Sequence, residues 1–338
     1  MKIDAQIAPS SPADVSEIAR SAEAAGFDAI WSSETQHDPF LPLALVSEHT
    51  ERMRFGTSVA IGFARSPATL AYTAWDLAAA SNGRFILGLG TQVKPHIERR
   101  FGMPWPASPV GMLRELIEAV RAFWQAWQTG EQLNYRSEHY KLTLMTPFFD
   151  PGPIEHPNIP IYIAGVNTGL SRLAGEVADG FHAHVYHSPR YLREVVLPAI
   201  NEGAVSANRS PDEIYLSTAA FTVTGPEEAK RVRSQIAFYA STPTYRPVME
   251  LHGWGETAER LQSLARKGAW DKMAREIDDE MLGTFAVVCE PAELPTRLIE
   301  RYDGLVDRLT LYMPYVPGQR DNEWNELLHG VQAQTGIA

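Results

Sequence analysis

Short apolar runs alternate with helical patterns along most of the chain. Most of these runs are continuous rather than alternating, which is the pattern expected of parallel strands buried on both faces. Eight of them have the length and composition of strands: KIDAQIA (2–8), FDAIWS (27–32), RFGTSVAI (54–61), RFILGLG (84–90), PIYIAG (160–165), GFHAHVY (180–186), EIYLSTAAFTV (213–223) and DRLTLYMP (307–314).

Helical patterns lie between these runs, and Ser-Pro pairs mark several of their starts. Ser can cap a helix N-terminus, and Pro suits the first helical position because its missing N–H has no partner there. The segment after Ser108 is the clearest example. Its apolar residues repeat at helical spacing as far as Trp127, and Gly130 is placed to end the helix. The pairs occur at 11–12, 66–67, 108–109, 188–189 and 210–211.

Eight strands alternating with helices predict a single α/β domain over residues 1–338, a (β/α)8 TIM barrel. A doubly wound open sheet is the alternative, but it would need a Gly-rich turn after the first strand, and IAPSSP offers none. Two connections are too long for one helix. They predict insertions near 131–158, after strand 4, and near 242–283, between strands 7 and 8, and both are expected to cover the barrel mouth.

Composition narrows the class of partner. The formal charge of −11 argues against nucleic acid and against anionic membranes as the main partner. The single cysteine, Cys289, allows no intramolecular disulfide, and the N-terminus carries no signal-peptide pattern. A cytoplasmic location is therefore expected.

The active site of such a barrel lies at the carboxyl ends of the strands. Polar residues follow several of the predicted strands at this edge. The turn AGVNTG ends strand 5 and opens a helix, so its backbone N–H groups and the helix dipole favour a phosphate. The strand-end residues are Glu34, Thr35, Gln36 and His37 after strand 2, Ser58 and Val59 in strand 3, Thr91 and Gln92 after strand 4, and Gly165, Val166 and Asn167 after strand 5.

His182 and His184 lie two residues apart in strand 6, so their side chains share one face. A metal site would need a further ligand from another strand end, for which His37 or Glu34 are available. We predict no metal, and we interpret the histidines as groups that hydrogen-bond substrate or cofactor. No G-x-S-x-G motif is present to support a nucleophilic hydrolase.

Several blocks of the chain resemble the luciferase-like flavin and deazaflavin oxidoreductases, in particular the branch that uses coenzyme F420. The resemblance covers nearly the whole chain and implies a barrel with insertions, a homodimer, and a cofactor at the barrel mouth. Coenzyme F420 is the expected cofactor, with FMN as the alternative. The blocks are EAAGFDAIWSSETQHDPFLPL, RFGTSVAIGFARSPATLAYTAWDLAAASNGRFILGLGTQ, HYKLTLMTPFF and IPIYIAGVNTGLSRLAGEVADGFHAH.

The resemblance also implies roles for individual residues. It places a non-prolyl cis peptide at Ser58-Val59, behind the cofactor ring, and the cofactor phosphate at Gly165, Val166 and Asn167. Thr35, Thr91 and Gln92 complete the predicted cofactor-binding set.

Three histidines are candidate proton donors, since histidine titrates near neutral pH: His37, His182 and His184. Glu34 is expected to orient the ring or a neighbouring histidine. Sugar-phosphate dehydrogenases of this superfamily carry an Asp-His pair after strand 2 and an acid after strand 4. This chain has Glu34-Thr35 and Val93 there, so that activity is not expected.

The sequence thus predicts an F420-dependent oxidoreductase that transfers a hydride between the deazaflavin and a small organic substrate. An FMN-dependent monooxygenase of the same fold is the main alternative. A metal-dependent barrel hydrolase that uses His182 and His184, and a non-catalytic flavin-binding protein, are the remaining ones.

Overall fold

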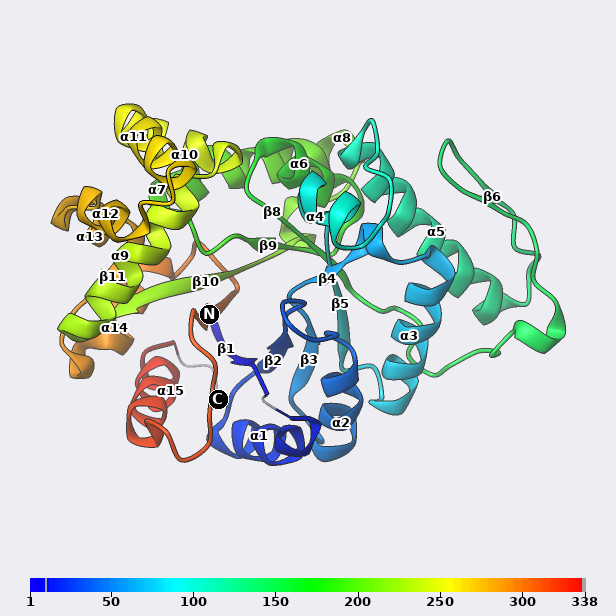
Figure 1. Ribbon diagram of the computed structural model, residues 1–338. Helices are drawn as coiled ribbons and strands as arrows, with labels where there is room; N and C mark the ends of the chain where they lie inside the picture. The colour runs from blue at the N-terminus through cyan, green and yellow to red at the C-terminus, as the bar shows by residue number, and fades with distance from the viewer. Residues whose placement is uncertain (10, 336–338) are drawn as a thin grey trace.

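The computed structural model describes residues 1–9 and 11–335. Within them, eight parallel strands close into a barrel, and the last strand pairs with the first (Figure 1). The predicted (β/α)8 TIM barrel is therefore confirmed. In order around the barrel the strands are β1 (Lys2–Ile7), β2 (Ala29–Ser32), β3 (Arg54–Thr57) with its continuation β4 (Ala60–Ile61), β5 (Phe85–Gly90), β8 (Ile161–Gly165), β9 (Gly180–Ala183), β10 (Tyr215–Val223) and β12 (Arg308–Leu311).

Helices surround the barrel, and the predicted Ser-Pro starts are confirmed at four of the five positions. The hydroxyls of Ser11, Ser66, Ser108 and Ser188 accept backbone N–H groups at helix N-termini, whereas Ser210 opens only a short 3₁₀ turn. The covering helices are α1 (Pro12–Ala25), α2 (Leu41–His49), α3 (Pro67–Ala80), α5 (Pro109–Thr129), α6 (Thr168–Val177), α7 (Pro189–Tyr191), α8 (Leu197–Ser206), α14 (Leu294–Tyr302) and α15 (Asp321–Thr335).

A buried ion pair joins the first and last strands inside the barrel. Both nitrogens of the Arg308 fork donate to Asp4, at 2.7 Å each, and the Trp31 indole N–H donates to the same carboxylate at 2.8 Å. The Arg308 and Asp4 side chains are 3% and 0% exposed. Because strand register brings these residues together, the pair is made only when the barrel closes.

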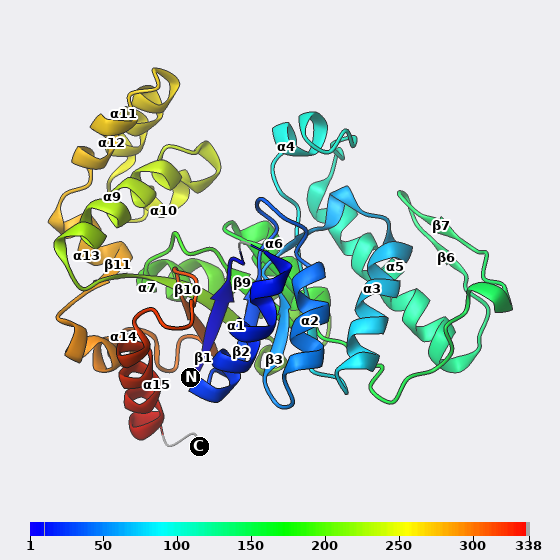
Figure 2. The ribbon, with the colours of Figure 1, turned by 60° about the horizontal axis from the view of Figure 1, so that its bottom comes forward.

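The insertion after β5 contains the predicted hairpin, but the hairpin does not cover the mouth. Strands β6 (Tyr135–Arg136) and β7 (Lys141–Leu142) pair antiparallel and lie beyond α3 and α5, on the outside of the barrel wall (Figure 2). The Glu115 carboxylate on α5 accepts from the hairpin residues Ser137 and His139. These polar contacts hold the hairpin against α5, away from the mouth. The part of this connection that stands at the mouth is the helix α4 (Lys94–Arg99).

The connection after β10 is mainly helical, and it approaches the mouth as predicted. Figure 2 shows its helices on one side of the carboxyl ends of the strands, with α4 on the other. It also contains a short strand that the sequence analysis missed, which extends the sheet beyond β10. The elements are α9 (Pro226–Ala240), α10 (Arg246–Glu250), α11 (Gly255–Arg266), α12 (Trp270–Met273), α13 (Asp279–Phe285) and β11 (Ala286–Val288).

No helix in the described part of the chain has the length and apolar character needed to cross a membrane.

Variants of Asp4 and Arg308 test how much this ion pair contributes to the stability of the closed barrel. Replacing Asp4 by Leu leaves the Arg308 cation buried without a counter-charge, so we expect the free energy of unfolding to fall by about 3–5 kcal/mol. The double variant Asp4→Leu/Arg308→Met buries no charge and should lose less. Urea titrations of both variants measure the difference. A double variant that loses as much as Asp4→Leu, or more, would contradict this account.

Candidate functional site

The third barrel strand is interrupted at the mouth by a cis peptide between Ser58 and Val59, as predicted. The interruption separates β3 from β4. The Ser58 N–H donates to the Ser32 carbonyl at 2.8 Å, and the Ser33 hydroxyl donates to the Ser58 carbonyl at 2.7 Å. Since both contacts come from the end of β2, that strand end fixes the position of the cis peptide.

Two glycines let β5 approach this segment. A Cβ at Gly88 would overlap the Thr57 carbonyl oxygen, and one at Gly90 would lie 2.6 Å from Cγ2 of Val59. The GLG sequence at the end of β5 therefore serves close strand packing behind the cis peptide rather than phosphate binding.

The Glu34 carboxylate is engaged by the protein itself. Its Oε2 accepts the Ile61 N–H at 2.7 Å and an Arg65 guanidinium N–H at 2.5 Å, and its side chain is only 7% exposed. Arg65 also donates to Asp38 at 2.9 Å. These contacts tie the end of β2 to β4, so they give Glu34 a positioning role within the protein. Its predicted part in catalysis, to orient the cofactor ring or a neighbouring histidine, stays a prediction.

Thr35, Gln36 and His37, which follow Glu34 in this loop, face solvent. His37 is exposed, and among the described residues it has no hydrogen-bond partner. The Thr35 carbonyl accepts from Arg100 at 2.7 Å, which joins this loop to the segment that follows α4. An exposed imidazole that no neighbouring group holds in place is poorly positioned for proton transfer to a bound substrate. The surroundings of His37 therefore do not support its predicted role as a proton donor, which stays a prediction.

The turn after β5 has a conformation fixed by its own side chains. Gln92 has a positive φ of 59°, and its side-chain carbonyl accepts the Val93 N–H at 3.0 Å. The Thr91 hydroxyl donates to the Gln92 carbonyl at 3.0 Å. The Gln92 side-chain NH₂ is then the group left to donate to a ligand. The predicted cofactor contacts of both residues stay a prediction.

The turn after β8 has the features of an anion site. Asn167 precedes the ten-residue helix α6, but its side chain accepts no hydrogen bond from the first N–H groups of that helix. The Asn167 Oδ1 atom is buried with no hydrogen-bond partner among the described residues. The Tyr191 hydroxyl holds the turn by donating to the Val166 carbonyl at 3.1 Å, and a Cβ at Gly165 would lie 2.7 Å from that of Leu170. The N-terminus of α6 therefore fits a phosphate group, whereas the Asn167 Oδ1 atom, which can only accept, fits a hydroxyl donor of the same ligand.

His182 lies within the barrel and not at its mouth. Its ring packs edge-on against Trp31, with the centroids 4.9 Å apart, and against Tyr162 at 5.2 Å. Burial, and then the nearby Arg308 cation, lower the pKa of His182 to about 3. The imidazole is therefore neutral near pH 7, and His182 does not fit the predicted role of proton donor.

His184, two residues further along, reaches the mouth. Its Nδ1 accepts the Tyr186 N–H at 3.1 Å, so the neutral ring carries its proton on Nε2. Burial lowers the pKa of His184 to about 4, which keeps the ring neutral near pH 7. Its Nε2–H is thus a hydrogen-bond donor whose only described partner is the Tyr245 hydroxyl, at a long 3.5 Å.

Two aromatic residues that pack against His184, Tyr239 and Tyr245, were missed by the sequence analysis. The Tyr245 ring stacks on the imidazole with centroids 4.8 Å apart, and the Tyr239 ring meets it edge-on at 4.7 Å. The Tyr186 hydroxyl is buried without a partner among the described residues. Tyr239 and Tyr245 come from the helical insertion, where apolar periodicity does not reveal which helix face meets the barrel.

Among residues 1–9 and 11–335, His182 and His184 share no cluster with a third metal-ligating side chain. The one group with metal-ligand spacing in this part of the chain is Glu115, Glu138 and His139. There the Glu115 carboxylate already accepts the His139 ring N–H at 2.9 Å and anchors the hairpin.

The neutral state of His184 can be tested through the pH dependence of stability. Its pKa is lower in the folded protein than the usual 6.5 of the unfolded chain, so its contribution to stability is present above pH 6.5. That contribution is lost as the pH falls toward 4, at about 1.4 kcal/mol per pH unit. Urea titrations between pH 7 and 5 should show a shallower loss for His184→Phe than for the unaltered protein. Equal slopes would contradict the assignment.

Comparison with known proteins agrees with this geometry. An uncharacterized protein of Mycobacterium tuberculosis is 44% identical over 315 residues, which cover 91% of this chain and 92% of the relative. An F420-dependent glucose-6-phosphate dehydrogenase of Amycolatopsis mediterranei is 25% identical over 321 residues, covering 90% and 89%. The coenzyme F420 dependent tetrahydromethanopterin reductase from Methanopyrus kandleri shares the fold, with a TM-score of 0.79 at 20% identity over 98% and 99% of the two chains. Residues 2–308 match the luciferase-like monooxygenase family, and the chain therefore belongs to that family.

Proposed function

We propose that this protein is an F420-dependent oxidoreductase that transfers a hydride between the deazaflavin and an organic substrate at the barrel mouth. The observation that carries the proposal is the turn after β8, where the uncapped N-terminus of α6 fits a phosphate and the unpartnered Asn167 Oδ1 atom fits a ligand hydroxyl beside it. Support also comes from a relative named for F420 that aligns with 90% of this chain.

The residues that would hold the cofactor come from several strand ends. Gly165, Val166, Asn167 and the first turn of α6 would bind its phosphate. The Ser58-Val59 peptide would support one face of its ring. When bound, the deazaflavin would supply the hydride-carrying centre, and the protein would supply binding, orientation and polar contacts.

The chain's own contribution to the reaction would come mainly from His184. A neutral imidazole with its proton on Nε2 donates a hydrogen bond without adding a charge to the mouth. Tyr239 and Tyr245 hold the ring from two sides and exclude water from it. This arrangement suits polarisation of a substrate oxygen, because a donor fixed in a dry site needs no reorganisation.

Binding of the cofactor gives the direct test. Titration of the protein with coenzyme F420, followed by fluorescence, should show one saturable site, and titration with FMN should be at least about tenfold weaker. Tight binding of FMN without binding of F420 would replace the proposal by a monooxygenase that uses FMN, the activity for which the family is named. Turnover of any substrate would exclude a non-catalytic role.

The Asn167 amide offers a sharper prediction. Because its Oδ1 atom has no partner among the described residues, Asn167→Leu removes no known hydrogen bond at that atom and should leave the free energy of unfolding unchanged within about 0.5 kcal/mol. The same change should weaken F420 binding by about tenfold through the lost ligand contact. Asn158→Leu, a change of the same type at the opposite end of the barrel, is the control and should bind normally. Normal binding by Asn167→Leu would remove this turn from the site.

A further inference from the structure

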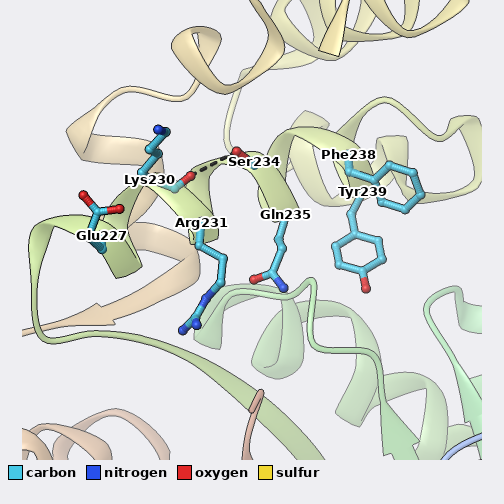
Figure 3. A pocket seen from close by; sticks show the side chains of 7 residues that line it. All are labelled: Glu227, Lys230, Arg231, Ser234, Gln235, Phe238 and Tyr239. Atoms are coloured by element: carbon cyan, nitrogen blue, oxygen red, sulfur yellow. Dashed lines mark hydrogen bonds between the residues drawn. The ribbon is translucent and has the colours of Figure 1, made fainter. Parts of the chain in front are cut away.

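Helix α9 carries a line of side chains that leads away from His184. Arg231, Gln235 and Tyr239 are spaced four residues apart, which places them on one face of the helix. Figure 3 shows the three side chains pointing to the same side of α9. They line a cavity of about 470 Å³ together with Glu227, Lys230, Ser234 and Phe238.

The Tyr239 end of this line belongs to the mouth. Besides its edge-on contact with His184, the ring lies 6.0 Å from Tyr186 and 5.8 Å from Tyr245. Its hydroxyl is satisfied by the Tyr312 hydroxyl at 2.6 Å. With that polar atom already paired, Tyr239 presents mainly an aromatic surface to a ligand.

The Arg231 end carries a cation without a counter-charge. Within the described residues, the exposed Arg231 guanidinium makes no hydrogen bond or ion pair, although two other arginines in this part of the structure do. Arg233 pairs with Asp279, and Arg320 pairs with Glu228 and Glu323.

Neither of the two acids spaced to pair with Arg231 along the helix does so. Glu228, three residues before Arg231, accepts from Thr224 and pairs with Arg320. Glu227 lies four residues before Arg231, but the two side chains are not within ion-pair distance. Figure 3 shows the Glu227 carboxylate directed away from the guanidinium. The guanidinium is therefore free to meet an anion that the protein does not supply.

We propose that this cavity binds an elongated organic acid as the substrate, with its carboxylate on Arg231 and its apolar body along Gln235 and Tyr239 toward His184. This assignment rests on the proposed function and adds the class of substrate. Arg presents a planar fork of donors that matches a carboxylate, and the Gln235 amide adds a donor beside it. Eight helical residues span about 12 Å, which sets the distance between the acid and the reacting end.

Two matched probes test the assignment: 6-phenylhexanoate, whose ring and carboxylate span about 12 Å, and its uncharged methyl ester. Calorimetric titrations are made on the full chain, with and without F420. We expect the acid to bind at least about tenfold more tightly than the ester. Arg231→Gln should abolish that preference. Lys230→Gln removes the same charge one residue earlier. Lys230 also lines the cavity, but its side chain points to the other side of α9 in Figure 3, so the variant should keep the preference.

The possible outcomes separate this proposal from the proposed cofactor. Equal binding of acid and ester, including binding of neither, overturns it, as does a preference that survives Arg231→Gln. If Arg231→Gln and Lys230→Gln weaken acid binding equally, the acid is attracted by the overall positive charge and not held by Arg231, and the proposal is also overturned. If Arg231→Gln weakens F420 by the same factor as the acid, the guanidinium serves an anionic part of the cofactor and the substrate assignment fails. Failure of the unaltered protein to bind F420 refutes the proposed function, while the comparison of acid with ester on the cofactor-free chain still decides the cavity.

Discussion

The buried pair of Asp4 and Arg308 is the constraint on which the rest of the structure depends. It joins the first strand to the last, and it exists only in the closed barrel because the two residues are 304 positions apart in the chain. A buried cation without its partner is costly, so open or misregistered sheets are disfavoured. The same cation helps to keep His182 neutral, which makes that histidine part of the barrel interior.

Closure of the barrel brings separate strand ends together at the mouth. The end of β2 holds the Ser58-Val59 peptide through Ser33 and binds β4 through Glu34. These groups are held by strands and by short hydrogen bonds, so the floor of the mouth is rigid before any ligand arrives. The helical insertion adds the aromatic wall around His184, and the substrate is expected to meet this wall and the floor together.

The periodicity of the sequence predicts the barrel well, because strands buried on both faces leave continuous apolar runs and capped helices leave Ser-Pro starts. The strand ends locate the mouth and the turn at Asn167, and the family resemblance implies the cis peptide at Ser58-Val59. The roles of individual side chains are harder to predict from the sequence. Glu34 resembles a free acid until Arg65, 31 residues later, is seen to bind it. His182 and His184 share a strand face, yet only their depth in the barrel separates an interior residue from one at the mouth.

The central claim is that the mouth binds a deazaflavin on the Ser58-Val59 peptide and on the turn before α6. A crystal structure of the protein with coenzyme F420 tests it most directly. We predict electron density for the ring beside Ser58 and Val59, and for the phosphate at the first turn of α6 within hydrogen-bond distance of the Asn167 side chain. Density for the cofactor at any other place, with this mouth filled by ordered water alone, would contradict the account.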